Sequence, residues 1–230
     1  MKIKTAIILC AGFGKRLNPV TLKVPKPLLK INNKSLLSET IELAINIGIK
    51  KIKLNTYYLS DKITSYVKTH SYKNNIEIMH DGEEILNTGG GVKNIINKST
   101  EENFIIFNPD TLWNLNYKKI ILEMIDYYEN NKLNNLLMVV NKSKSFDKRL
   151  KGDFTMENHK LNKNKNSEYI FTGFQIINRK IIDKVDEKIF SMNKVWDIQL
   201  NNSMLHGYES DQKFVHLTDI KIYNSLLENN

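Results

Sequence analysis

The feature that most constrains this chain is an apolar run near its start that leads directly into a glycine-rich turn. The run Ala6-Ile7-Ile8-Leu9 is continuously apolar, as expected for a strand that is buried on both faces of a parallel sheet. The turn that follows contains Gly12 and Gly14, and then the basic residues Lys15 and Arg16. Ligands of open α/β sheets bind beyond the carboxyl ends of the strands, so this turn is the first candidate binding site.

Strand-like and helix-like segments alternate over the first 140 residues. Apolar residues at helical spacing, with Gly48 as a stop, predict a helix over 35–47. Similar patterns predict strands at 51–55, 76–79, 104–107 and 136–140. They also predict three helices: one capped by Ser60, one that follows Gly91, and one that covers 117–128. This alternation predicts an α/β fold with a Rossmann-like, mixed and mostly parallel sheet that carries helices on both faces.

The last third of the chain has a different pattern. Residues 141–168 are polar and rich in lysine, which predicts a short hairpin and an exposed loop. We expect strands at 169–177 and 213–217, and helices at 179–186, 194–205 and 219–228. Neither an internal repeat nor a long linker divides the sequence, so we expect a single domain over residues 1–230.

Composition excludes several classes of protein. With 41% hydrophobic residues over 230 positions, the chain is long enough to bury a core. The one cysteine, Cys10, cannot form an internal disulfide, and no Cys/His cluster suits structural zinc, which favours a cytoplasmic protein. No apolar run reaches the roughly 18 residues of a membrane span, and the segment after Met1–Lys4 is too short for a signal-peptide core. We therefore expect no membrane partner.

The net charge of +9 raises the possibility of a nucleic-acid partner. Lysine and asparagine are spread along the whole sequence, as in the run at 163–166, and no zinc-finger, basic-zipper or RNA-recognition motif is present. Diffuse charge of this kind favours compositional bias over a binding face. We expect no nucleic-acid partner and keep a basic RNA-binding protein only as a remote alternative.

The glycine-rich turn has the composition of a phosphate-binding loop. Glycines at 12 and 14 leave backbone N–H groups free to converge on phosphate oxygens, and Lys15 and Arg16 add positive charge. The turn is neither a dinucleotide fingerprint, because Leu17 stands where a third glycine would fall, nor a Walker A loop. A tight strand-to-helix turn without a ligand is the alternative.

Nearby, Pro25 and Pro27 flank Lys26 and predict a stiff, extended loop, although a surface lysine between prolines is also common.

Taken together, six short motifs resemble those of the sugar-1-phosphate nucleotidylyltransferases. They are Leu9 to Leu17, Pro25 to Leu28, Glu84 to Gly91, Phe107 to Asp110, Gly152 to Phe154 and Tyr169 to Gly173. The triple glycine and the Gly-Asp-Phe motif are most similar to the small N-acetylmuramate 1-phosphate uridylyltransferase type, with the mannose-1-phosphate guanylyltransferases as near relatives. The resemblance implies a GT-A type of Rossmann-like fold, and 230 residues leave no room for a β-helix domain.

The resemblance also implies a reaction, in which a nucleoside triphosphate and a sugar 1-phosphate form a nucleoside diphosphate sugar and pyrophosphate. Residues 1–140 would bind the nucleotide, residues 141–230 would bind the sugar, and the protein would be a monomer or a homodimer. A phosphate monoester is already largely dianionic near neutral pH, so the attack needs charge neutralisation rather than a general base. The implied catalytic residues are Arg16, Lys26 and Asp110.

The remaining site residues are expected to contact the substrates. Those assigned to the nucleotide are Leu9, Ala11, Gly12, Gly14, Lys15, Gly89 and Gly90. Gly89 and Gly90 would leave room for the planar base because they lack side chains. Those assigned to the sugar side are Asn108, Gly152, Asp153 and Thr172.

Asp110 follows the apolar strand at 104–107, where a metal carboxylate at the edge of a sheet is expected. Its oxygen donors suit Mg²⁺, although Asn108-Pro109-Asp110 would also form a simple turn. The family's second metal carboxylate is missing, because His216 stands at its position and Asp219 is better placed to cap the last helix. If His216 binds the metal, its imidazole favours Mn²⁺ or a similar softer ion. This departure leaves open a catalytically weak nucleotide-sugar-binding or regulatory homologue.

Overall fold

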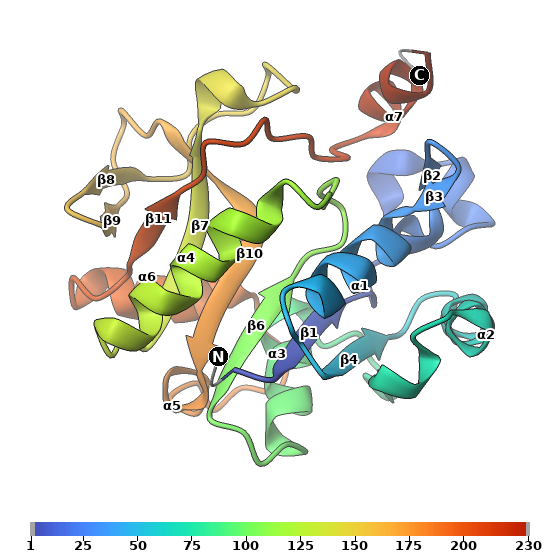
Figure 1. Cartoon of the computed structure of the whole chain (residues 1–230), viewed down its shortest axis with the longest axis horizontal. Helices are drawn as coiled ribbons and strands as arrows, with labels where there is room; N and C mark the ends of the chain where they lie inside the picture. The colour runs from blue at the N-terminus through green and yellow to red at the C-terminus, as the bar shows by residue number, and fades with distance from the viewer. Residues whose placement is uncertain (1–2, 229–230) are drawn as a thin grey trace.

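The computed structural model describes residues 3–228. Met1, Lys2, Asn229 and Asn230, which complete the expected 1–230 range, lie outside the described residues. Within 3–228, the strands of a seven-stranded sheet run in the order β11-β7-β10-β6-β1-β4-β5 (Figure 1). They are β1 (Thr5–Leu9), β4 (Lys51–Thr56), β5 (Ile76–His80), β6 (Asn103–Phe107), β7 (Asn135–Asn141), β10 (Tyr169–Asn178) and β11 (Gly207–Glu209).

Strand β10 runs antiparallel to its neighbours β6 and β7, and the other pairings in this sheet are parallel. The sheet is therefore mixed and mostly parallel, as predicted. The register pairs Ile7 of β1 with Lys53 of β4 and with Ile106 of β6, so β1 lies in the middle of the parallel part. The carboxyl ends of β1, β4 and β6 consequently meet at one edge.

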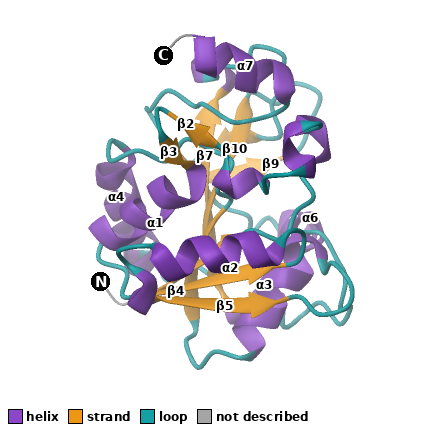
Figure 2. Cartoon of the chain, turned by 90° about the vertical axis from the view of Figure 1, so that its right-hand side faces the viewer, coloured by secondary structure: helices purple, strands orange, loops and turns teal. Residues whose placement is uncertain are grey.

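Helices cover both faces of the sheet, which confirms the predicted α/β architecture. Figure 2 shows α2 and α3 on opposite sides of β4 and β5. Ile8 of β1 belongs to the core on the α1 side, whereas Ile7 belongs to the core on the α3 side, which explains why the whole run is apolar. One face carries α1 (Leu36–Asn46), α2 (Ser60–Thr69) and α4 (Tyr117–Asn130), and the other carries α3 (Asn87–Asn97), α5 (Arg179–Ile182) and α6 (Met192–Asn201).

Several local predictions are wrong. Ser60 is the first residue of α2 rather than its cap, and Leu59 takes the cap position with a left-handed backbone (φ 49°). Helix α3 begins at Asn87, before the triple glycine rather than after it, and its glycines allow it to pack closely against residues 188–190. Helix α5 ends at Ile182 and helix α6 ends at Asn201, each four residues earlier than predicted.

The segment 213–217 was predicted to be a strand, and it is not one. It makes only isolated bridges, from Phe214 to Ser145 and from His216 to Thr111. Its two partners are loop residues rather than a neighbouring strand, so no continuous ladder forms. The sheet is instead extended at this end by β11, which pairs with β7. The last helix, α7 (Ile220–Glu228), is capped by Asp219 as predicted, whose Oδ1 accepts from the N–H groups of Lys221 and Ile222.

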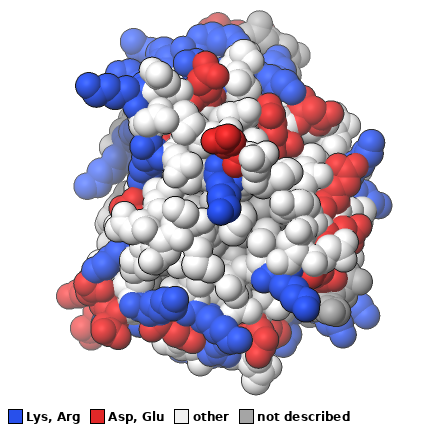
Figure 3. Space-filling view, turned by 90° about the vertical axis from the view of Figure 1, so that its left-hand side faces the viewer, with Lys and Arg blue, Asp and Glu red and all other residues white. Residues whose placement is uncertain are grey.

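The predicted hairpin in the polar segment is present as β8 (Thr155–Glu157) and β9 (Lys160–Asn162). On the face shown in Figure 3, acidic and basic side chains are interspersed around an uncharged area, as expected for a diffuse charge distribution. Among residues 3–228, no helix has the length and apolar character needed to cross a bilayer.

Candidate active site

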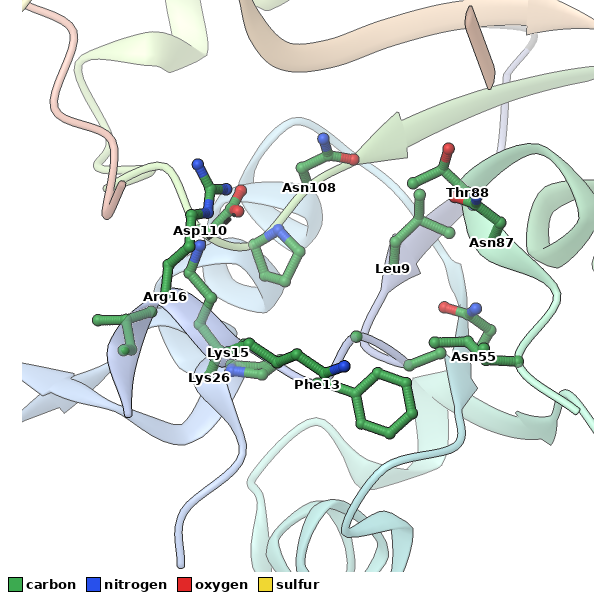
Figure 4. A pocket seen from close by; sticks show the side chains of 17 residues that line it. Leu9, Phe13, Lys15, Arg16, Lys26, Asn55, Asn87, Thr88, Asn108 and Asp110 are labelled. Carbon is green, nitrogen blue, oxygen red and sulfur yellow. Dashed lines mark hydrogen bonds and ion pairs between the residues drawn. The ribbon is translucent and has the colours of Figure 1, made fainter. Parts of the chain in front are cut away.

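A cavity of about 400 Å³ lies at the edge where the carboxyl ends of β1, β4 and β6 meet (Figure 4). Small-molecule sites usually have roughly 300–1,000 Å³, so the cavity is large enough for a ligand. Its lining comes from the turn after β1, the end of β4, the start of α3 and the turn after β6. These residues are Leu9, Ala11 to Leu17, Lys26, Pro27, Asn55, Ile85, Asn87, Thr88 and Asn108 to Asp110.

The glycine-rich turn forms one wall of the cavity. Gly14 has a left-handed backbone (φ 65°), and a Cβ there would lie 3.0 Å from Thr21 Cγ2, so only glycine fits without strain. The Thr21 hydroxyl donates to the Gly14 carbonyl and holds the turn in place. A Cβ at Gly12 would meet nothing within 4 Å, so this part of the backbone faces open space. The predicted phosphate loop therefore lines the cavity.

Positive and negative groups meet at one end of the cavity. Lys26 Nζ lies 2.7 Å from Asp110 Oδ2, although the two residues are 84 positions apart. Lys26 begins a 3-10 turn (Lys26–Leu28) and does not lie in the fully extended loop that was predicted, because the fixed φ of Pro27 suits the first turn of a helix. Figure 4 shows Arg16 beside Asp110, and Arg16 forms no ion pair with any residue in the described range.

Asp110 is held in its ionised form. Burial alone would raise the pKa of its carboxyl, but the neighbouring Lys26 ammonium, which also donates a hydrogen bond to it, holds that pKa well below its usual value. The second carboxylate oxygen, Oδ1, is buried and accepts no hydrogen bond from any residue in 3–228. A buried carboxylate oxygen without a partner is a costly arrangement unless a cation or a donor completes it.

His216 lies next to this unpaired oxygen. Its Nδ1 is 3.6 Å from Asp110 Oδ1, which is too long for a hydrogen bond. The segment is held there by backbone bonds from Leu217 N to the Asp110 carbonyl and from Leu112 N to the Val215 carbonyl. Burial lowers the pKa of His216, so the imidazole is neutral near pH 7 and has a lone pair for a metal.

The opposite end of the cavity has a charged side chain in Lys15, whose Nζ lies 5.2 Å from the centroid of the Phe13 ring. It includes Asn55 and Phe13, which the sequence reasoning missed. The Asn55 side chain accepts from Cys10 N at 2.9 Å and donates to Asp81 at 3.2 Å, so its orientation is fixed. Asn55 could have been found from its position near the carboxyl end of a strand beside β1. Cys10 itself is buried in the core, as expected for a small residue at a strand end.

Three expected glycine contacts are not formed in the cavity. A Cβ at Gly89 would lie 2.3 Å from the Phe190 ring, and one at Gly90 would lie 2.2 Å from the Lys188 carbonyl oxygen. These glycines serve the packing of α3 and line neither cavity described here, which corrects their expected role at the base. Gly152 similarly lies against the backbone of Ser167, 2.2 Å from the position of an added Cβ.

Thr172 lines neither cavity either. It is buried, and its hydroxyl donates to the Met138 carbonyl at 3.0 Å. The expected contact with sugar hydroxyls is therefore wrong. The shift in pairing register between Phe171 and Gln175 of β10 could not be seen in the sequence.

A second hollow of about 360 Å³ adjoins the first cavity, and Leu9, Thr88 and Asn108 line both. Its other walls come from the segment around Asp153, from β10 and from the start of α6. They are Asp153, Phe154, Lys163, Phe171, Gln175, Ser191, Met192, Asn193 and Trp196. Asn108 and Asp153 thus lie where ligand contacts are possible, whereas most of the aromatic wall was not predicted.

Known proteins resemble the chain in both sequence and fold. The chain is 36% identical over 124 residues to a D-glycero-alpha-D-manno-heptose 1-phosphate guanylyltransferase of Aneurinibacillus thermoaerophilus, a match covering 53% of each protein. It is 21% identical over 223 residues to the N-acetylmuramate alpha-1-phosphate uridylyltransferase of Caulobacter vibrioides, covering 94% of this chain and 92% of that protein. A mannose-1-phosphate guanylyltransferase catalytic subunit beta of Drosophila melanogaster is 31% identical over 120 residues, covering 50% of this chain and 32% of that protein. The chain therefore spans about half of the first relative and a third of the last.

The fold matches a solved structure along its whole length. HddC from Yersinia pseudotuberculosis, solved in complex with GMP-PN, has a TM-score of 0.75 at 22% identity and covers 99% of both chains. The family model for nucleotidyl transferases matches residues 5–146. That range includes the phosphate loop, Lys26 and Asp110, so the family resemblance drawn from the motifs is confirmed. The chain belongs to the nucleotidyl transferase family.

Proposed function

We propose that this protein transfers a nucleotidyl group from a nucleoside triphosphate to a sugar 1-phosphate, releasing pyrophosphate. The observation that carries the proposal is the division of the first cavity into a charged end, where several ionised groups converge, and an end walled by a ring and an amide, with Lys15 over the ring. Arg16, Lys26 and Asp110 converge at the charged end beside the glycine-rich turn, whereas Asn55 and Phe13 lie at the other. A nucleoside triphosphate has the same division between its phosphates and its base.

The two cavities support the expected division of labour along the chain. The lining of the first cavity comes entirely from residues 9–110, within the part assigned to the nucleotide. Most of the second hollow comes from residues 153–196, within the part assigned to the sugar. Asn108 borders both, so a sugar 1-phosphate placed across this border would have its phosphate near Lys26 and its ring in the second hollow.

In the proposed reaction, an oxygen of the sugar phosphate attacks the α-phosphorus in line with the leaving pyrophosphate. The nucleophile is already an anion, so the main task of the protein is to bring two polyanions together. Backbone N–H groups of the turn at Gly12 and Gly14 bind phosphate oxygens, and the Arg16 guanidinium binds the departing pyrophosphate with two parallel hydrogen bonds. Lys26 holds the attacking and transferred phosphates, and Lys15 adds a weaker contribution from its exposed position.

The residues at the charged end fit a divalent cation. The unpaired Asp110 Oδ1 lies 3.6 Å from His216 Nδ1, and a neutral imidazole keeps a lone pair on one of its two nitrogens for a metal. Within residues 3–228 no group of three or more His, Cys, Asp or Glu side chains could hold a metal, so phosphate oxygens would complete the coordination. A bound Mg²⁺ or Mn²⁺ would neutralise phosphate charge. An imidazole in place of a carboxylate favours Mn²⁺.

The test is an array of nucleoside triphosphates against sugar 1-phosphates, each with Mg²⁺ or Mn²⁺, with pyrophosphate release as the readout. We expect release to depend on both substrates together. Lys26→Ala should abolish most of it, with circular dichroism as the control for folding. Tight binding of a nucleotide sugar without turnover of any pair would refute the proposal and favour the catalytically weak homologue.

A further inference from the structure

Arg149 joins two carboxylates that lie far apart in the sequence. Its Nη2 lies 2.7 Å from Asp147 Oδ2 and 2.9 Å from Asp219 Oδ2, and its Nε donates to Asp147 Oδ1 at 2.8 Å. The Asp147 side chain is only 2% exposed, and a buried charge of this kind needs a fixed partner. These three residues, the Arg149 cluster, lie outside the range 5–146 that the family model matches, so the match does not account for them.

The Arg149 cluster holds the chain just after His216. Asp219 lies three residues after His216, and its other oxygen, Oδ1, caps α7. The Thr218 hydroxyl, two residues after His216, hydrogen-bonds to Asp147. Arg149 therefore fixes this part of the chain in two ways, directly through Asp219 and indirectly by orienting Asp147.

The chain just before His216 is held separately. Phe214 is buried, and its ring stacks on the imidazole with the centroids 5.9 Å apart and the planes at 18°. Its backbone bonds to Lys144 and Phe146, in the loop that leads to Asp147. His216 thus lies between a buried aromatic residue on one side and the Arg149 cluster on the other. Loss of the cluster would loosen one side while the other stays fixed.

The position of His216 matters because of the unpaired oxygen beside it. His216 Nδ1 lies 3.6 Å from Asp110 Oδ1, and a cation at this place needs both side chains at once. The residues of such a site must be held within about 0.5 Å of the productive geometry. Groups that orient metal ligands from outside the coordination shell therefore contribute to affinity.

We propose that Arg149 is a positioning residue for the cation site: by joining Asp147 to Asp219, it holds His216 against Asp110. Arg149 lines neither cavity, so it acts through the chain rather than through a ligand. The proposal rests on the proposed function, because it takes His216 as a metal ligand.

Arg149→Met tests the proposal, with Mn²⁺ alone as the probe and electron paramagnetic resonance as the measurement of its affinity. Positioning and simple electrostatics predict opposite results. Removing the guanidinium leaves two carboxylates without their partner, and this added negative charge by itself would tighten Mn²⁺ binding. A displaced imidazole would weaken it instead. Outer-shell partners contribute about 10–100-fold to metal affinity, and Arg149 acts through the backbone, so we expect a loss near the low end, about tenfold. Unchanged or tighter binding would overturn the proposal.

A double-mutant cycle shows whether the effect passes through His216. The four proteins are the wild type, Arg149→Met, His216→Ala and the double variant. In the His216→Ala background, Arg149→Met should no longer weaken Mn²⁺ binding, because the ligand that it positions is absent. An equal loss in both backgrounds would refute the route through His216. If His216→Ala alone leaves the affinity unchanged, His216 is not a metal ligand and the proposal is wrong.

Two further variants separate positioning from general stability and from charge. Arg179 also donates to backbone carbonyls, those of Ser99 and Glu101, and lines neither cavity. Arg179→Met should therefore lower the Tm but change Mn²⁺ affinity less than about twofold. Arg149→Lys keeps the charge but loses the planar fork that joins two carboxylates, so we expect an intermediate loss of affinity. Full affinity in this variant would show that the bridge is not needed, and the variant also replaces Arg149→Met if that protein does not fold.

Hydrogen exchange gives a readout that needs neither metal nor turnover. The Leu217 N–H donates to the Asp110 carbonyl and adjoins His216. In Arg149→Met, the protection of the Leu217 amide should fall, while that of Ile106 in the middle of the sheet should stay the same. Unchanged protection of Leu217 would contradict the proposed role of Arg149.

The two proposals can fail separately. Pyrophosphate release by the wild type, together with a Mn²⁺ affinity that does not depend on Arg149, would refute the positioning role and leave the transferase activity standing. Weaker Mn²⁺ binding in Arg149→Met that disappears in the His216→Ala background, without turnover of any substrate pair, would do the reverse.

Discussion

Replacing Lys26 with methionine removes the ammonium and keeps most of the side-chain length, so it isolates the role of the charge. The Lys26–Asp110 pair is short, at 2.7 Å, and only 12% and 22% of the two side chains are exposed. A preorganised group aimed at developing negative charge contributes about 10²–10³-fold in kcat, or about 2.7–4 kcal/mol. We expect kcat to fall at least about 100-fold. The KM for the triphosphate should change less, because the glycine-rich turn and Arg16 remain.

The same substitution should lower stability in a pH-dependent way. It leaves the Asp110 carboxylate without its ion-pair partner, at a cost of about 1–3 kcal/mol, below the 3–5 kcal/mol of a fully buried pair. The Tm of a chain of this size should fall by roughly 2–4 °C per kcal/mol. The pKa of Asp110 is depressed in the folded protein, so its contribution is present above the unfolded carboxyl pKa of about 3.9. It is lost as the pH falls through the depressed value, so the Tm difference between wild type and variant should shrink at low pH.

Steady-state pyrophosphate release measures the effect on kcat. Thermal unfolding between about pH 3 and pH 7 measures the pH-dependent effect on stability. Lys119→Met is the control, because Lys119 is 88% exposed and lies on α4 away from the cavity. It should match the wild type in both assays. A Lys26→Met protein with kcat within threefold of the wild type would show that the ammonium is not part of the catalytic machinery.

Four further predictions concern the metal and the packing. Asp110→Asn removes the charge that would hold a cation, so Mn²⁺ binding measured by electron paramagnetic resonance should weaken at least about tenfold; unchanged affinity would return Asp110 to the role of a turn residue. His216→Asp should shift the ratio of Mg²⁺- to Mn²⁺-supported turnover toward Mg²⁺, and an unchanged ratio would place His216 outside the metal site. In the wild type, burial lowers the pKa of His216, so Mn²⁺ binding should persist below pH 6.5, where an unperturbed histidine would already be half protonated. Gly90→Ala should lower the free energy of unfolding by at least about 2 kcal/mol, because the added Cβ would overlap the Lys188 carbonyl oxygen; an unchanged Tm would contradict that close approach.

The parts of the site that follow directly from a strand could be predicted. Ala6 to Leu9 forms a buried strand, and the residues after it must appear at the carboxyl edge of the sheet. The same reasoning places Asp110 just beyond β6. In both places the functional residue lies within a few positions of a strand that its own apolar run identifies. The local sequence is therefore enough to place that residue at the edge of the sheet.

Positions that depend on contacts between distant segments could not be predicted. The motif at Gly89 and Gly90 would read the same if these glycines faced a ligand or if they packed against Phe190. Only the packing of α3 against 188–190 shows that the second alternative is correct. Thr172 is buried and bonded to the Met138 carbonyl, whereas its neighbour Phe171 lines the second hollow, and only the pairing of β10 with β7 shows which of the two alternating faces points to that hollow.

The charged end of the cavity shows the same limit. Lys26, Asp110 and His216 are far apart in the sequence, and the short distances between them depend on how three loops meet at one edge of the sheet. The sequence by itself determined the type of sheet, the phosphate loop and the residues capable of phosphate chemistry, because these depend on local pattern and residue type. The tertiary structure decided that His216 faces the unpaired oxygen of Asp110 and that Gln175, Asp153 and Trp196 share one hollow, because such distances arise only when the core has packed.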